Sequence, residues 1–124
     1  MEPNPDIDFK GKPVYVQIAE RLMESLRDAG ADTRVPSVRE YAATMEVNIN
    51  TVMRSYELLE RRSVVYNRRG VGFFVSPDAG SRIAGYFSEE FFDKELPRFF
   101  ARMKKLGVSP DKLQSLYQNY LDKQ

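Results

Sequence analysis

Apolar residues recur at helical spacing in the first part of the chain. Pro13 can open a helix because the first helical position needs no N–H donor. One apolar face follows, made by Tyr15, Ile18, Ala19, Leu22 and Leu26. Gly30 is the expected end of this helix. Residues 1–12 show no periodic pattern and are predicted to be an extended arm.

A short second helix is predicted after a loop. Ser37 and Glu40 have the S-x-x-E spacing of a capping box, in which the serine accepts a bond from the amide three residues on. We expect the helix to end near Met45 or Glu46. Its inner face is predicted to consist of Val38, Tyr41, Ala42 and Met45.

A third helix is predicted from Asn48, a favourable N-cap, to Arg61 or Arg62. Its apolar side carries Val52, Tyr56 and Leu59, and a separate polar side carries Asn50, Thr51 and Arg54. Two short helices in quick succession, the second with a polar leading end, are typical of a helix-turn-helix.

The period then changes to that of strands. Residues 64–67 and 71–75 are β-rich and flank Arg68, Arg69 and Gly70, which predicts a small hairpin with a basic tip. Gly72 adds backbone freedom near that tip. Ser76, Pro77 and Asp78 are expected to close the unit.

Residues 79–124 are richer in aromatic side chains and are predicted to form two helices. The first is expected from about Ser88 to Leu106, with Pro97 either kinking or breaking it. Gly107 ends it, and Ser109 with Pro110 begins the second. The predicted fold is mainly α with a small β-hairpin: a winged helix-turn-helix at 1–77 and a two-helix dimerisation or effector region at 78–124.

Composition removes several classes of function. The chain has no cysteine and no histidine, which excludes disulfides and disfavours zinc sites and thiol or imidazole catalysis. No nucleophile–base pair, phosphate-binding glycine loop or metal cluster is evident, so we expect neither an enzyme nor a bound cofactor. The N-terminus lacks a signal-peptide pattern, no apolar run is long enough to span a membrane, and a cytoplasmic location follows as the default.

The net charge of the chain is small, but its positive charge is concentrated in one segment. The net charge is +1, yet residues 61–72 contain four arginines and no acid. A basic edge indicates an anionic contact surface, although a solvated charge run would look the same.

Double-stranded DNA fits this arrangement of helices and hairpin. Arginine pairs with guanine and asparagine with adenine in the major groove, while hairpin arginines can reach phosphates. Each side chain also has a structural alternative: Arg54 can pair with Glu57 or Glu60, and Thr51 can cap the helix. The predicted DNA-binding residues are Ser37, Arg39, Asn50, Thr51, Arg54, Arg68, Arg69 and Gly70.

Four segments carry a family resemblance: PSVRE, VNINTV, RSYELLE and GVGFFV, within an ungapped match over residues 13–75. Together they resemble the winged helix of GntR-family transcriptional regulators. The resemblance implies that Arg39 contacts DNA, that Asn50 and Thr51 lead the recognition helix, and that Arg54 and Gly70 belong to the contact surface. The short helical tail resembles the YtrA-like branch.

The chain departs from the family pattern at Ser63, where glycine is usual, at Val35, where leucine is usual, and at Phe73, where threonine is usual. Ser63 affects the passage from the third helix to the hairpin. Phe73 lacks a hydroxyl that could meet a phosphate.

A homodimer is expected, because the tail is too small to bury its rings alone. A local core against the first helix is the other explanation for those rings. The predicted dimerisation residues are Phe87, Phe91, Phe92, Phe99, Phe100, Leu113, Leu116, Tyr117 and Tyr120.

The expected function is that of a regulator, in the first place a repressor, reading a pseudo-palindromic operator. A winged-helix module that binds protein instead of DNA is the alternative. A cleft between the tail and the winged helix is one candidate site for an unidentified small-molecule effector, and no residue pattern names that ligand.

Overall fold

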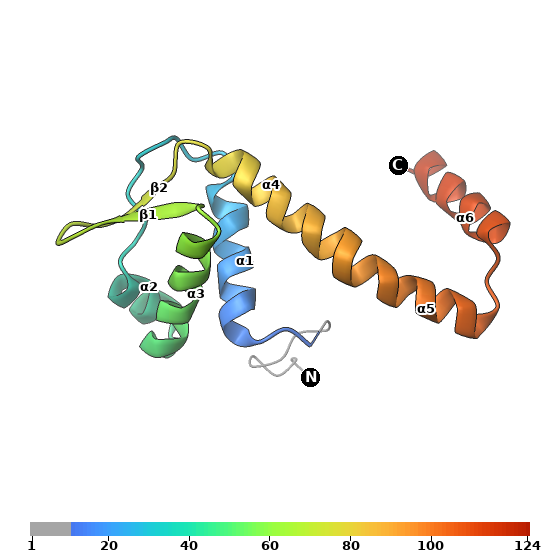
Figure 1. The fold of residues 1–124 in the computed structure, drawn as a ribbon, viewed down its shortest axis with the longest axis horizontal. Coiled ribbons are helices and arrows are strands. Elements are labelled where there is room, and N and C mark those ends of the chain that lie inside the picture. Colours follow the sequence, from blue (N-terminus) through green and yellow to red (C-terminus); the bar gives the residue numbers. More distant parts are fainter. Residues whose placement is uncertain (1–10) are drawn as a thin grey trace. The chain divides into compact units, whose positions relative to one another are not determined.

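The computed structural model describes residues 11–124, so most of the predicted arm lies outside the described residues. The chain forms two compact units, here called the N-terminal unit, up to Tyr86, and the C-terminal unit, Phe87–Gln124 (Figure 1). The mainly helical fold with a small antiparallel hairpin is confirmed. No helix of the described chain is both long and apolar enough to cross a membrane.

The N-terminal unit packs three helices and a hairpin around one core. Its elements are α1 (Val14–Leu26), α2 (Val38–Met45), α3 (Ile49–Arg61), β1 (Val65–Arg68) and β2 (Gly72–Val75), followed by the start of α4 (Ala79–Glu89). α1 and α3 lie side by side (Figure 1). The largest fully buried side chains of the core include Met23, Tyr56, Leu59 and Ile83.

The end of α1 differs from the prediction. The helix stops at Leu26 and the amide of Ala29 donates to the carbonyl of Leu26 in a turn. Gly30 comes later and does not adopt a positive φ, so it does not act as a left-handed C-cap.

Both caps of the helix-turn-helix are confirmed. Ser37 Oγ accepts a bond of 3.1 Å from the amide of Glu40, and Asn48 Oδ1 accepts one of 2.7 Å from the amide of Asn50. Between the helices, Glu46 adopts a left-handed conformation with φ 55° and reverses the chain. Met45 was predicted to face inward but is 39% exposed, because it is the last residue before this reversal.

The hairpin pairs Val65 with Val75 and Arg68 with Gly72. Arg68 therefore belongs to strand β1. The sequence pattern predicts it in the tip of the hairpin, and that prediction is wrong. The turn is closed by the amide of Val71, which donates to the carbonyl of Arg68 over 2.8 Å. Gly70, at φ 78°, supplies the left-handed backbone that this turn requires.

A further extended segment lines β2, although its sequence suggested only a loop. The amide of Val35 donates to Phe73 over 2.9 Å, and the amide of Val75 donates to Thr33 over 2.8 Å. These bonds cover the free edge of the hairpin, which a two-stranded ribbon would otherwise leave open.

The helix after the hairpin begins at Ala79, well before the predicted start near Ser88. Ala79, Ile83 and Tyr86 are its buried residues and have helical spacing. Gly80 and Gly85 weaken the helical signal of this segment, since glycine is a poor helix former. The sequence pattern set a domain boundary at 77–78, whereas the compact units meet at Tyr86 and Phe87 because this first part of α4 is buried in the N-terminal unit.

Pro97 does not break the helix, but the helix before it is not an ordinary α-helix. A π-helical segment, Glu90–Glu95, directly precedes α5 (Leu96–Leu106), in which Pro97 occupies the first turn. The amide of Leu96 bonds to the carbonyl of Phe91, five residues back. This wider turn makes room where the proline ring would meet the preceding turn of an α-helix. Gly107 ends α5 at φ 72°, and Ser109 caps α6 (Pro110–Asp122), as predicted.

Candidate nucleic-acid interface

The leading end of α3 presents polar side chains on a rigid support. Asn50 is exposed and Thr51 half-buried, while Val52, Tyr56 and Leu59 hold the opposite side of the helix in the core. Ser55 anchors α3 to α1, because its hydroxyl donates to the carbonyl of Tyr15 over 2.7 Å. The cap thus fixes the first turn of α3, and this bond fixes the second turn against α1.

Arg54 lies differently from the prediction of a free base-reading side chain. Its guanidinium carbon is 4.1 Å from the ring centroid of Tyr15 on α1, a cation–π contact. The suggested pairing with Glu57 or Glu60 is not what the structure shows for this side chain. Arg54 remains exposed to solvent, so the contact holds its position without burying it.

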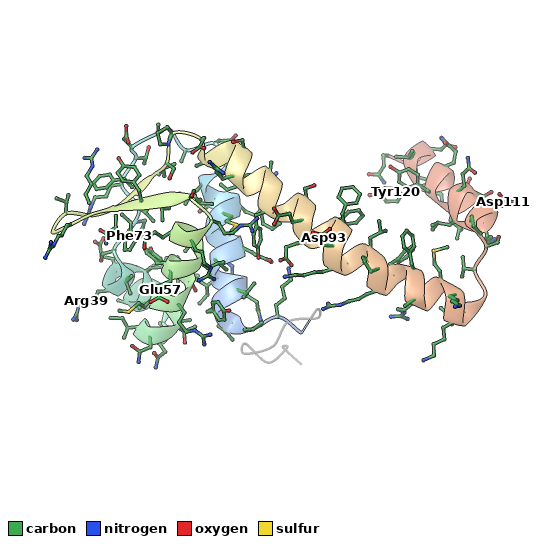
Figure 2. All side chains as sticks on the ribbon, in the orientation of Figure 1. Arg39, Glu57, Phe73, Asp93, Asp111 and Tyr120 are labelled. Atoms are coloured by element: carbon green, nitrogen blue, oxygen red, sulfur yellow. The ribbon has the colours of Figure 1, made fainter. Side chains whose placement is uncertain are left out.

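Ser37 and Arg39 lie at the start of α2. The hydroxyl of Ser37 is used by the cap, while Arg39 is exposed and points away from the unit (Figure 2). The carboxylate of Glu40 lies 3.7 Å from the guanidinium of Arg34. Arg39 is therefore the basic side chain of α2 that faces solvent.

The hairpin holds its two predicted arginines in different ways. Arg68 donates to the hydroxyl of Tyr66 over 3.0 Å, and its guanidinium carbon lies 4.4 Å from the ring centroid of Phe74. Tyr66 in turn donates to the carboxylate of Asp32. The pKa of Tyr66 is raised, chiefly because this bond holds its proton. Arg69 is exposed in the turn beside Gly70.

Tyr56 of α3 connects this helix with the start of α2 and with the hairpin, beneath the predicted DNA-binding residues. Its hydroxyl donates to the carbonyl of Pro36 over 2.5 Å, just before α2, and its ring meets that of Phe73 edge-on at 5.1 Å. Burial, with smaller contributions from Tyr41 and Glu40, raises the pKa of Tyr56 to about 12. Phe73 therefore packs inward against α3, where a phosphate would not reach.

Arg34 is a basic residue of this surface that the sequence reasoning missed. It lies in the segment beside β2, and a Cβ at Gly72 would be 3.7 Å from its Nε atom. It thus stands between the start of α2 and the hairpin. Its place directly before Val35-Pro36-Ser37 is the available signal, but the sequence predicts only a loop for this segment.

The predicted dimerisation residues lie in the C-terminal unit, which buries no residue at all among its described positions. Phe87 and Leu113 are half-buried. The other seven are exposed, with fractions from 45% to 60%: Phe91, Phe92, Phe99, Phe100, Leu116, Tyr117 and Tyr120. Neighbouring rings contact one another, as in the pair Phe91 and Phe92 at 5.0 Å.

Metal-binding groups do not gather in the described part of the chain. No set of three or more His, Cys, Asp or Glu side chains there could hold a metal ion.

Comparison with known families identifies the helices and hairpin. The family model described as bacterial regulatory proteins, gntR family, matches residues 14–75. These residues run from the start of α1 to the end of β2.

Two relatives from Bacillus subtilis illustrate the range of similarity. The HTH-type transcriptional regulator YhcF is 34% identical over 104 residues, which cover 82% of this chain and 84% of YhcF. The HTH-type transcriptional repressor YtrA is 35% identical over 71 residues, which cover 54% of this chain and 53% of YtrA.

Solved structures agree with the fold along most of the chain. A putative GntR-family regulator from Bacteroides thetaiotaomicron superposes with a TM-score of 0.74 and 38% identity, over 89% of this chain and 97% of that one. A transcriptional regulator from Oenococcus oeni gives 0.70 and 26%, over 98% and 97%.

Proposed function

This chain belongs to the GntR family of DNA-binding transcriptional regulators, and we propose on this premise that it is a repressor that binds a pseudo-palindromic operator as a homodimer. One observation carries the proposal: the first turn of α3 is capped and faces solvent, α3 packs on α2, and the hairpin that follows α3 carries arginine. This is the arrangement in which a helix enters the major groove while a hairpin lies over the neighbouring minor groove. YtrA, one of the relatives, is named a repressor.

Base reading is assigned to side chains around the first turn of α3. Exposed Asn50 is assigned to adenine, and half-buried Thr51 and Ser37 are assigned to phosphate or base edges beside it. Arg39, exposed on α2, is suited to guanine or to the phosphate backbone. Arg54 reaches a base only by leaving the ring of Tyr15, a contact worth about 0.5–1 kcal/mol at an exposed site.

Phosphate contacts are assigned to the hairpin and its neighbour. Arg69 and Gly70 form the tip, where a glycine lets a phosphate approach the backbone closely. Arg68 would contact phosphate from the same face of the hairpin as Tyr66. Arg34 would contact the DNA backbone that separates the two grooves. These arginines should supply affinity without sequence preference.

The homodimer is assigned to the C-terminal unit. A segment of this size with no buried residue cannot support its own fold, so its exposed rings need a partner surface. A two-fold pair of chains would present two copies of α3 to successive major grooves, about one helical turn apart. Such a regulator acts where the chromosome is, in the cytoplasm.

The test is binding to a pool of random duplexes, measured by fluorescence anisotropy at two salt concentrations, with sequencing of the bound fraction. We expect steep salt dependence and an enriched site with two-fold symmetry. Arg39→Ala should lower discrimination at one position of each half-site by about 1–3 kcal/mol.

Arg82→Ala is the matched control, since Arg82 lies on α4, pairs over 2.9 Å with Asp78 just before that helix, and is not among the residues proposed to contact DNA. It should bind as the unaltered protein does. Absence of salt-dependent binding would contradict the proposal and favour a winged-helix module that binds protein.

A further inference from the structure

The N-terminal unit exposes few large apolar side chains. Among its described residues, the large hydrophobic side chains exposed by more than a third are Met45, Met53 and Val71, at 39%, 47% and 58%. Met45 ends α2, Met53 lies on α3, and Val71 lies in the hairpin turn. Single exposed apolar residues are common on proteins, but Met53 lies on the helix that the proposed function sets in the major groove.

Met53 occupies the outward face of α3. It follows Asn50 by three residues and precedes Glu57 by four, a spacing that brings side chains onto one face of a helix. Asn50, Met53 and Glu57 are all exposed, and Figure 2 shows Glu57 on α3. Arg54, the next residue, is drawn over Tyr15 instead. One turn behind Asn50, the side chain that faces a bound groove is thus apolar.

We propose that Met53 is a specificity-determining residue that reads the 5-methyl group of a pyrimidine in the major groove. This inference rests on the proposed function, because it requires α3 to enter that groove. The methyl group of thymine is the apolar feature that distinguishes base pairs there, and side chains recognise it by direct contact. The unbranched, polarisable side chain of methionine adapts well to such a contact.

The neighbouring residue makes the assignment consistent. Asn50 is suited to adenine, whose partner in the duplex is thymine. Met53, one turn along the same helix face, would then contact the methyl group of that pair or of the pair beside it. Burial of one methyl group between the two surfaces corresponds to about a three- to tenfold gain in affinity.

The experiment removes the methyl group from the DNA. A duplex is selected from a random pool with the unaltered protein, and each thymine is replaced in turn by deoxyuridine at constant salt. At one thymine per half-site, we expect uracil to weaken binding about three- to tenfold. Met53→Ala should bind the thymine and uracil duplexes equally, and Met53→Leu should restore the preference.

Met45→Ala is the matched control, because it removes an exposed methionine at the end of α2 and should leave the thymine-to-uracil ratio unchanged. A second set of duplexes places cytosine or 5-methylcytosine at the same position. Tighter binding to the methylated base would show that the methyl group is read whatever pyrimidine carries it, and a response to thymine alone would restrict the contact to that base.

The outcomes separate the two proposals. Equal binding of thymine and uracil duplexes at every position, or an unchanged ratio in Met53→Ala, would overturn the role of Met53 and leave the operator-binding function intact. Failure to enrich any duplex would overturn both.

Discussion

Ser63 links α3 to the hairpin with a left-handed backbone, at φ 61°. A residue with a Cβ atom is strained in this conformation by about 1–2 kcal/mol. This strain explains why glycine is usual at this position in the GntR family. The amides on either side bond back to α3: that of Ser63 to Glu60 over 3.0 Å and that of Val64 to Leu59 over 2.9 Å. The conformation is therefore imposed by the end of the helix.

Ser63→Gly should raise the free energy of unfolding by about 0.5–1 kcal/mol, the relief of strain being partly offset by a more flexible unfolded chain. Urea denaturation measures the change. Ser25→Gly in the right-handed helix α1 is the control, and it should lower stability by a similar amount. A loss of stability in Ser63→Gly would show that the serine is not strained.

At the same scale, the sequence identified the candidate arginines but not their positions. Arg54 and Arg68 each lie over an aromatic ring supplied by another element, Tyr15 on α1 and Phe74 on β2. Neither contact has a local sequence signature, because the two partners are brought together only by packing. Asn50 and Arg39 were easier to place, since a capped helix start fixes the direction of its first side chains.

Among the elements, α3 depends on Asn48 for its first turn. The side chain of Asn48 accepts the bond from the amide of Asn50, one of the amides that a helix start leaves without a partner. The same turn carries Asn50 and Thr51, so the cap supports both the fold and the proposed reading surface.

Asn48→Ala should destabilise the protein by about 0.5–2 kcal/mol, while Asn48→Ser should change its stability by only a few tenths. Thermal or urea unfolding of both variants provides the measurement. The cap would be shown to contribute nothing if the alanine and serine variants unfolded at the same midpoint.

The π-helical segment before Pro97 is the element that the sequence left undecided. A proline inside a helix pattern predicts either a kink or a break. Here the chain widens over Glu90–Glu95 and continues as helix, with Leu96 bonding five residues back. Local rules did not distinguish these outcomes, because they depend on how the neighbouring turns can adapt.

For the whole molecule, the contrast between the two units governs the proposed assembly. The N-terminal unit has a core that includes Met23, Tyr56 and Leu59, each at most 1% exposed. The C-terminal unit buries none of its residues, and Phe92, Tyr117 and Tyr120 are each more than half exposed. Apolar surface of this extent favours association.

Tyr117→Glu should convert the proposed dimer into single chains, because a charge on the paired surface would lose its water. Light scattering at micromolar concentration should give the mass of one chain for the variant and of two for the unaltered protein. Gln114→Glu adds the same charge on an exposed position of α6 and should remain dimeric. A single-chain mass for the unaltered protein would disprove the dimer.

The sequence by itself determined most of the helices, the hairpin, the caps at Ser37, Asn48 and Ser109, and the family. These features depend on neighbours within a few residues, whose spacing is written in the chain. The tertiary structure alone decided that the segment before α2 lines β2, that Arg54 turns to Tyr15 and that Met53 faces outward. The reason is physical: these features depend on residues far apart in sequence, which become neighbours only when the core forms.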